Sequence, residues 1–312
     1  MNTIGVDIGG TKIGAGVVDE AGHVLAQTRY DTDPTDPGAI ERAVISAVAE
    51  LRKAHEVSAV GVAAAGFVSP RRDGVLFAPN IAWRDYPLRD RLSRGISLPI
   101  VVENDANAAG WAEFRFGRGR DVEHMIMATV GTGLGGAIIV DGRLLRGAFG
   151  AAGEIGHMQM VPNGHYCGCG HEGCWEMYGS GRALTRAARA AAVAYPERAA
   201  ALIELAGGSG EKIKGPQVTQ AAQAGDPLAI ELFADLGYWL GAGISDLAAI
   251  VDPEIAVIGG GVAQAGDLLL EPARESFREH LSARGYRGEL TIELAEFGNE
   301  AGIVGAADLA RH

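Results

Sequence analysis

The sequence predicts an α/β protein with two domains, and three observations support this. Its 312 residues are enough for two domains of ordinary size. Continuous apolar runs, typical of buried strands, alternate with segments whose apolar residues recur at helical spacing. A strand–glycine turn–strand segment also occurs twice. We expect a small α/β domain at 1–108, to which a helix at 300–312 returns, and a large α/β domain at 109–299.

The first part of the chain predicts strands around one helix. Three β-rich segments predict strands at 3–8, 13–19 and 24–30. Residues 37–54 predict a helix, because one face collects the apolar residues Ile40, Val44, Ala47, Val48 and Leu51. The nearly continuous apolar run at 57–68 predicts one buried strand. A further strand at 98–105 leads into a helical segment at 106–117.

The C-terminal half is rich in alanine and predicts mainly helices. The helical segments are 183–194, 226–252, 266–281 and 302–310. One strand is expected among them, at 254–261, where an apolar run ends in three glycines.

The internal repeat consists of two similar segments, Asp7–Asp19 (DIGGTKIGAGVVD) and Thr129–Asp141 (TVGTGLGGAIIVD). The two segments align without a gap over thirteen positions, with Gly9 opposite Gly131. This match suggests a duplication. Proteins with two equivalent halves usually bind a ligand in the cleft between them, so we expect such a cleft.

Three glycine turns predict a nucleotide site, because backbone N–H groups freed from side chains can converge on phosphate oxygens. A tight turn without a ligand explains any one of them, but two in register, each with a threonine, favour a nucleotide. The candidate residues are Asp7, Gly9, Gly10, Thr11 and Lys12 in the first turn, Gly131, Thr132 and Gly133 in the second, and Gly259, Gly260 and Gly261 in the third.

Two common nucleotide motifs do not account for these turns. Gly131, Gly133 and Gly136 match the dinucleotide fingerprint, but that motif requires a helix directly after the glycines. A β-rich segment follows here, so the match is accidental. The sequence GxxxxGK[ST] of the Walker A motif is absent.

Asn104 and Asp105 stand where a predicted strand ends and a helix begins. Asp105 could simply cap the helix. Beside a phosphate donor it has a second role, that of the base that accepts a proton from an attacking hydroxyl group.

All three cysteines of the chain lie close together, at Cys167, Cys169 and Cys174, with glycines between them. Three thiolates in one loop suit zinc rather than magnesium or calcium. The spacing leaves the fourth ligand open among His157, His165 and His171. With any of them the zinc shell is closed, which indicates a structural site. Three thiols without a metal are the alternative.

Composition excludes several classes of partner. The net charge of −12 and the pI near 5.1 argue against non-specific binding to nucleic acid or an anionic membrane surface. We find no apolar run of membrane-spanning length and no signal-peptide pattern, so we expect a cytoplasmic protein.

The motifs DIGGTK, ENDANAA, GTGLGG, GEIGH, CGCGHEGCWE and IGGG resemble, in this order and over nearly the whole chain, those of the ROK family (repressors, open reading frames and sugar kinases). The segment at 78–83 is similar to that of the actinobacterial, ATP-dependent glucokinases in this family. The resemblance implies an actin-like ATPase (ribonuclease H-like) fold, with two α/β domains flanking a cleft, in a homodimer or homotetramer.

The resemblance also implies roles for single residues. Asp105 is similar to the catalytic base, and Asp7 to a residue that helps to position Mg²⁺. The sugar-binding residues would be Gly66 (through its backbone), Asn80, Asn104, Glu154, His157 and Glu176. The zinc ligands would be His157, Cys167, Cys169 and Cys174. The residues of the three glycine turns would contact ATP.

We therefore predict an ATP-dependent hexokinase that phosphorylates glucose at O6. Mannose, N-acetylmannosamine or N-acetylglucosamine are alternative acceptors, and polyphosphate is an alternative donor, although family members that use polyphosphate typically lack the cysteine cluster. A sugar-responsive repressor is the alternative from another class. Such repressors carry a winged helix-turn-helix before the first strand, for which a strand starting near Ile4 leaves no room.

Overall fold

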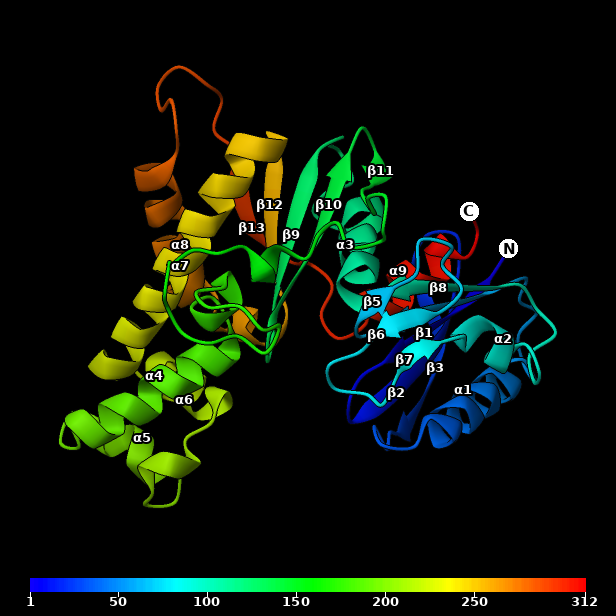
Figure 1. The fold of residues 1–312 in the computed structure, drawn as a ribbon, viewed down its shortest axis with the longest axis horizontal. Helices are drawn as coiled ribbons and strands as arrows, with labels where there is room; N and C mark the ends of the chain where they lie inside the picture. The colour runs from blue at the N-terminus through cyan, green and yellow to red at the C-terminus, as the bar shows by residue number, and fades with distance from the viewer. The chain divides into compact units, whose positions relative to one another are not determined.

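The computed structural model describes all residues 1–312, which form two compact units (Figure 1). Unit 1 comprises residues 1–123, 137–153 and 296–312, and unit 2 comprises residues 124–136 and 154–295. The chain therefore passes from one unit to the other four times, after Glu123, Gly136, Gly153 and Ala295.

Unit 1 is built on a five-stranded sheet with the order β3-β2-β1-β4-β8. Its strands are β1 (Thr3–Ile8), β2 (Lys12–Val18), β3 (Val24–Asp31), β4 (Val60–Ala64) and β8 (Ile100–Asn104). β1 is antiparallel to β2 but parallel to β4, and β4 is parallel to β8. The carboxyl ends of β1, β4 and β8 therefore share one edge of the sheet, and this edge carries both Asp7 and Asn104.

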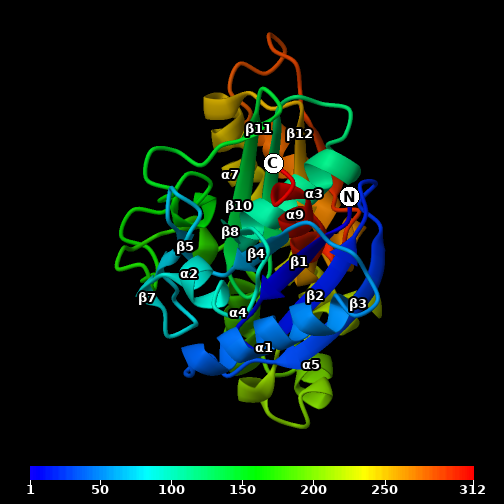
Figure 2. The ribbon, with the colours of Figure 1, turned by 90° about the vertical axis from the view of Figure 1, so that its right-hand side faces the viewer.

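Helices cover both faces of this sheet (Figure 2). Helix α1 (Pro37–Leu51) packs on β2 and β3, and it buries the five apolar residues that its spacing predicts. Helix α9 (Ala301–Leu309) packs on β1, β4 and α3 (Asp105–Phe116) on the other face. A side chain at Gly5 or Gly61 would overlap with backbone carbonyl groups of α9, so the two glycines let the helix approach the sheet closely.

The prediction of one strand at 57–68 is wrong, because the chain turns at Gly66. There φ is +145°, and a Cβ atom would lie 2.5 Å from the carbonyl oxygen of Phe77. After this turn, β5 (Phe67–Val68) joins a separate three-stranded sheet with β6 (Val75–Phe77) and β7 (Arg84–Tyr86). A short helix, α2 (Leu88–Leu92), then leads back to β8.

A second five-stranded sheet has the order β11-β10-β9-β12-β13. Its strands are β9 (Met125–Val130), β10 (Leu134–Val140), β11 (Arg143–Leu144), β12 (Ile255–Gly259) and β13 (Thr291–Leu294). β12 is parallel to both β9 and β13. The order repeats that of the first sheet strand by strand, so the duplication seen in thirteen residues extends to five strands.

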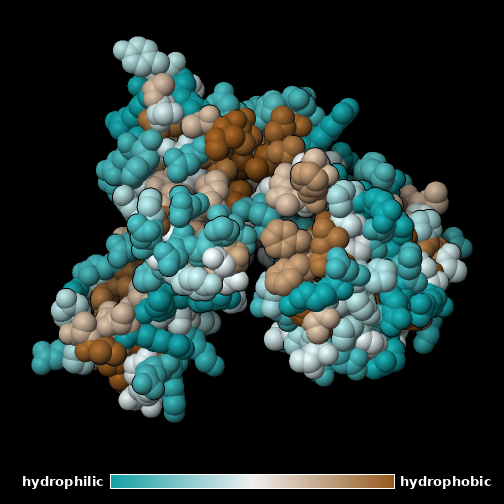
Figure 3. Space-filling model, viewed as in Figure 1, coloured by the Kyte–Doolittle hydropathy of each residue, from teal (hydrophilic) through white to brown (hydrophobic).

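The remaining helices belong to unit 2. They are α4 (Gly181–Ala194), α5 (Ala200–Leu205), α6 (Gly215–Gln223), α7 (Pro227–Val251) and α8 (Asp267–His280). The three long helices agree with the predicted segments, while the short α5 and α6 were not predicted. No helix combines the length and the apolar character that crossing a bilayer requires. The face drawn in Figure 3 is mainly hydrophilic, with small apolar areas.

Candidate active site

Two carboxylates lie near each other in unit 1, at the carboxyl edge of its sheet. Asp7 is on β1, and Asp105 is the first residue of α3, directly after β8. Burial, and then the charge of Asp105, raise the pKa of Asp7 to about 7. Burial also raises the pKa of Asp105, and backbone hydrogen bonds at the start of α3 only partly oppose this. Two carboxylates that are costly to ionise together form a site for a cation or for a proton.

Asp105 does not cap its helix, because Asn104 does. The Oδ1 atom of Asn104 accepts a hydrogen bond from the backbone N–H of Asn107 (2.9 Å). The side-chain amide of Asn104 donates to the carbonyl oxygen of Gly66 (3.1 Å). The sequence left capping open as the role of Asp105, and the structure gives this role to the neighbouring residue. The Asp105 carboxylate is therefore available for chemistry.

The first glycine turn joins β1 to β2 beside these carboxylates. It is closed by a hydrogen bond from the backbone N–H of Gly9 to the carbonyl oxygen of Lys12 (3.0 Å). Thr11 and Lys12 are exposed, and a Cβ atom at Gly10 would lie 3.9 Å from that of Asn80, which is also exposed. The turn thus presents a hydroxyl group and a cationic group to solvent, next to one of the predicted sugar residues.

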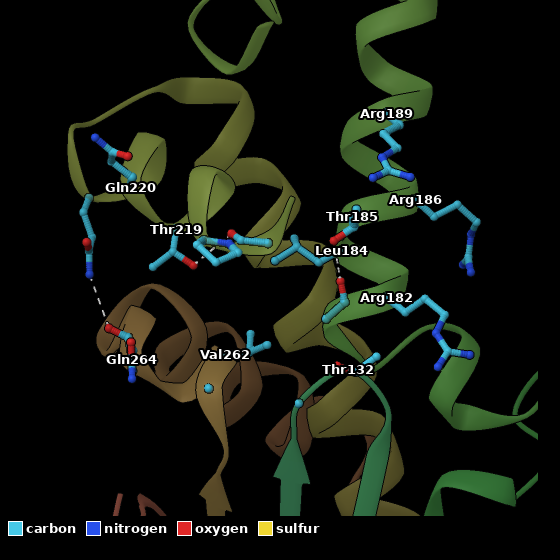
Figure 4. A pocket seen from close by; sticks show the side chains of 16 residues that line it. Thr132, Arg182, Leu184, Thr185, Arg186, Arg189, Thr219, Gln220, Val262 and Gln264 are labelled. Carbon is cyan, nitrogen blue, oxygen red and sulfur yellow. Dashed lines mark hydrogen bonds between the residues drawn. The ribbon is translucent and has the colours of Figure 1, made fainter. Parts of the chain in front are cut away.

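The second glycine turn, between β9 and β10, borders a cavity of about 980 Å³ that is lined only by residues of unit 2 (Figure 4). The turn is tied to the start of α4, because Gly181 and Arg182 donate backbone hydrogen bonds to the carbonyl oxygens of Gly131 (2.9 Å) and Thr132 (3.2 Å). The wall is formed by Gly131, Thr132, Gly181, Arg182, Leu184, Thr185, Arg186, Arg189, Gly215, Pro216, Thr219, Gln220, Gln223, Gly261, Val262 and Gln264.

The chemistry of this wall suits a nucleotide. Apolar side chains such as Leu184 and Val262 offer a surface for a flat base, and threonine and glutamine side chains can bind sugar hydroxyl groups. Arg182, Arg186 and Arg189 follow one another along α4 in Figure 4, and their positive charge favours an anionic ligand. Backbone carbonyl oxygens hold two of these side chains, because Arg186 and Arg189 donate hydrogen bonds to Met177 and Ile213.

Sequence reasoning missed most of this wall. The predicted residues Gly131, Thr132 and Gly261 line the cavity, but the side chains from α4 and α6 were not predicted. Gly259 and Gly260 are not among the lining residues. A Cβ atom at Gly259 would lie 2.6 Å from the methyl group of Met127, and one at Gly260 would lie 2.5 Å from the carbonyl oxygen of Val130. These two glycines allow close packing, whereas the Gly261 position is open.

Glu176 contacts the second glycine turn. Its Oε2 atom accepts a hydrogen bond from the backbone N–H of Leu134 (3.0 Å), and it occupies the space that a Cβ atom at Gly133 would fill. A side chain at position 133 would clash with the Glu176 carboxylate, so glycine is required there to leave room for it. Nothing lies within 4 Å of the corresponding position at Gly131.

The structure brings His157 together with the three cysteines. One ligand atom from each of His157, Cys167, Cys169 and Cys174 lies within 4.8 Å of the others. The Sγ atoms of Cys169 and Cys174 are 3.5 Å apart, and Nδ1 of His157 is 3.7 Å from Sγ of Cys167. Ligands at about 2.0 to 2.3 Å from a tetrahedral zinc ion have separations of this size. His165 and His171, which the spacing left open, are not in the cluster.

The charge balance of the cluster also fits a metal ion. Burial raises the pKa of Cys174 to about 12 and raises that of Cys167 as well. Without a cation these thiols stay protonated at neutral pH, and a bound Zn²⁺ would stabilise the thiolates. His157 ends a short 3₁₀ turn, Ile155–His157, that directly follows Glu154, and Trp175–Met177, which contains Glu176, directly follows Cys174. The cluster therefore fixes both flanking segments.

Comparison with known proteins agrees with this description. The model of the ROK family matches residues 3–312. A glucokinase of Streptomyces coelicolor is 50% identical over 309 residues, which cover 99% of this chain and 97% of the relative. The crystal structure of a ROK family glucokinase from Streptomyces griseus in complex with glucose and AMPPNP is 51% identical, with a TM-score of 0.92 and coverage of 100% of this chain and 99% of that one.

A regulator of the same family is also similar in structure. It is a ROK family transcriptional regulator, a homologue of the E. coli MLC protein, with 28% identity and a TM-score of 0.86, and the match covers 98% of this chain and 76% of the regulator. Because the family model spans nearly the whole sequence and two close relatives are about half identical, the chain belongs to the ROK family and has its actin-like ATPase fold.

Proposed function

We propose that the chain is an ATP-dependent glucokinase, which transfers the γ-phosphoryl group of ATP to O6 of glucose. The observation that carries the proposal is Asp105, a carboxylate at the start of α3 that is freed from capping by Asn104 and held at a raised pKa by burial. A base of this kind accepts a proton best when its pKa is close to the working pH. The similarity to a glucokinase that binds glucose and AMPPNP supports both substrates.

In the proposed reaction, Asp105, Asp7 and the residues of the glycine turns have different roles. Asp105 accepts the proton of the O6 hydroxyl while O6 bonds to the γ-phosphorus and the bond from that phosphorus to the bridging oxygen of ADP breaks. Asp7 would help to hold the Mg²⁺ that accompanies ATP, whose charge offsets that of the transferred group. The exposed Lys12 and the N–H groups of the glycine turns would bind phosphate oxygens.

We assign the acceptor to residues that carry carboxylate, amide and imidazole groups. Neighbouring hydroxyl groups of a hexose both donate and accept hydrogen bonds, so such groups can bind them in pairs and reject epimers that leave a partner unpaired. The proposed set is Asn80, Asn104, Glu154, His157 and Glu176, with the backbone of Gly66. Zinc on Nδ1 of His157 would leave Nε2 as a fixed hydrogen-bond donor to the sugar.

The donor site is the cavity beside α4, in which we place the adenosine of ATP. The zinc site is proposed as structural, because four protein ligands close its shell. We also propose a homodimer or homotetramer in the cytoplasm, as the family resemblance implies. Light scattering after gel filtration measures the oligomeric state.

A coupled assay over a panel of hexoses, with ATP or polyphosphate as donor, tests the proposal. We expect the largest kcat/KM with glucose and ATP. A maximum with N-acetylmannosamine would assign another acceptor, and a specific shift of DNA in a gel would favour the repressor.

Replacing the base completes the test. Asp105→Asn is expected to lower kcat by about 10² to 10⁴-fold while glucose binding stays measurable by calorimetry. Asp267→Asn is the matched control, because Asp267 is likewise the first residue of a helix, α8, but is exposed. Turnover of Asp105→Asn within tenfold of this control contradicts the assignment of the base.

A further inference from the structure

A buried carboxylate next to the proposed base has no role in the reaction described above. Glu103 is the second-last residue of β8, directly before Asn104, and only 2% of its surface is exposed. Its Oε2 atom lies 2.8 Å from Nε of Arg146 and 3.3 Å from Nε of Arg72. The carboxylate thus lies between two arginines in the interior of unit 1.

The other oxygen of Glu103 holds the start of α3. Oε1 accepts a hydrogen bond from the backbone N–H of Asn104 (3.1 Å) and another from the side-chain amide of Asn107 (3.1 Å). Asn107 is in turn the residue whose backbone N–H is capped by Asn104. Glu103 therefore holds the first turn of α3, which carries Asp105, through two hydrogen bonds.

Arg146 connects this carboxylate to a second segment. Its carbonyl oxygen accepts a hydrogen bond from the backbone N–H of Ala152 (3.1 Å), which closes a loop. Three glycines with positive φ, Gly147, Gly150 and Gly153, shape this loop. The next residue in the chain is Glu154, a proposed sugar ligand. Arg146 thus ties the loop that leads to Glu154 to the strand that leads to Asp105.

Arg72 reaches the cluster from a third segment. It has a left-handed backbone conformation, with φ of +56°, which a residue with a side chain adopts only at a cost. Its carbonyl oxygen accepts a hydrogen bond from the backbone N–H of Val102 on β8 (3.1 Å). This strained residue therefore lies directly beside β8, the strand that leads to the base.

Stability alone does not account for this cluster. Burying an ion pair costs desolvation energy that its attraction often fails to recover, and apolar residues of similar volume are commonly as stable. The hydrogen bond from Arg146 to Glu103 and those that Glu103 accepts from Asn104 and Asn107 provide what apolar contacts do not, a defined orientation of each partner.

We propose that Glu103, with Arg146 as its principal partner, is a positioning residue for Asp105. The pair fixes the first turn of α3 and the start of the loop at 146–153 in one network within unit 1, so that the base keeps its orientation. The inference rests on the proposed function, because it takes Asp105 as the base.

Arg146→Met tests the inference, since it keeps the length of the side chain and removes its charge. We expect kcat to fall by about tenfold to a hundredfold, because a misplaced catalytic group loses rate on this scale. The KM for ATP should stay within about twofold, because neither Arg146 nor the first turn of α3 is among the residues that we propose to bind ATP, and the cavity proposed for its adenosine is lined by unit 2. Amide hydrogen exchange should become faster in the first turn of α3. Arg146→Lys should recover part of kcat.

Arg91→Met is the matched control. Arg91 on α2 forms an ion pair with Glu41 on α1 in the same unit. The distance of 2.7 Å is similar to that between Arg146 and Glu103, but this pair does not contact α3. Glu103→Gln serves as a second variant if Arg146→Met does not fold, with the same decrease in kcat and the same increase in exchange expected.

Two results overturn the inference. One is a kcat of Arg146→Met within about twofold of the control, with unchanged exchange in α3. The other is a loss of kcat that only follows the fraction of protein able to bind AMPPNP, again with unchanged exchange. If the wild-type protein phosphorylates no hexose, the proposed function fails by itself, and the exchange measurement still decides whether Glu103 and Arg146 hold this turn.

Discussion

At the scale of single residues, Asp7 makes a prediction about pH. Its pKa rises from 3.8 in an unperturbed chain to about 7 in the folded protein, so the folded state binds the proton more tightly. Asp7 therefore lowers stability as pH rises from about 4 through 7, by at most roughly 1.4 kcal/mol per pH unit in the absence of Mg²⁺.

Asp7→Asn should remove this dependence. Urea unfolding at pH 5 and pH 8 should show that the free energy of unfolding of the wild type decreases relative to that of the variant by about 2.7 kcal/mol, because the dependence extends over the two pH units between pH 5 and the folded pKa of about 7. An equal difference between the two proteins at both pH values would contradict the raised pKa of Asp7.

Gly131 and Gly133 are two residues apart but make opposite predictions. Gly133→Ala places a methyl group where the Glu176 carboxylate lies, so we expect a raised KM for glucose and a lowered melting temperature. Gly131→Ala meets open space, so the melting temperature should be unchanged and only the KM for ATP should rise. Steady-state kinetics and calorimetry measure both variants. Equal behaviour of the two variants would contradict the packing role of Gly133.

At the scale of elements, the zinc loop makes a prediction about metal removal. Cys169→Ser removes one ligand, so zinc content measured by mass spectrometry should fall and the KM for glucose should rise. His165→Ala and His171→Ala are controls, because neither histidine belongs to the cluster. If Cys169→Ser lost zinc with no change in the KM for glucose, the loop would not position sugar ligands.

Elements with strong periodicity could be predicted from the sequence, and their ends were set by local chemistry. Helix α1 buries the five predicted residues, and β1 has the predicted bounds. The prediction of one strand at 57–68 was wrong because a run of apolar residues does not reveal the turn at Gly66. Helix α5 was missed because its six residues are too few for a periodic signal. Helix α6 has nine residues, as many as the predicted α9, but it buries only Val218, Ala221 and Ala222, so its apolar pattern is weak.

The candidate site, like the fold, contains groups that the sequence predicts and groups that it does not. Motifs with unusual residue types, the cysteines and Asn104-Asp105, identified groups that the fold brings together. The donor cavity was largely missed because its wall comes from α4, α6 and the turn after β12, whose arginines, threonines and glutamines are ordinary surface residues in sequence. Only tertiary structure gathers them.

At the scale of the whole molecule, the division of the cavity and the carboxylates between units makes a prediction about binding. AMPPNP alone should raise the melting temperature of the wild type and of Asp105→Ala equally, because Asp105 is not among the residues that we propose to bind the nucleotide, and the cavity proposed for its adenosine is lined by unit 2. At a hundred times its Kd the ligand adds about 2.7 kcal/mol of stability. Gly261→Val, which points a side chain into the cavity, should abolish the shift in thermal unfolding. A shift lost in Asp105→Ala would contradict this independence.

The close contact of α9 with Gly5 and Gly61 has a consequence for synthesis of the protein. The two glycines are made among the first residues, whereas the helix that covers them follows all of unit 2. During translation, one face of β1 and β4 therefore stays uncovered until α9 has left the ribosome. Unit 2, whose last residue is Ala295, can complete its core earlier. The half of the protein that is made first is thus the half that finishes folding last.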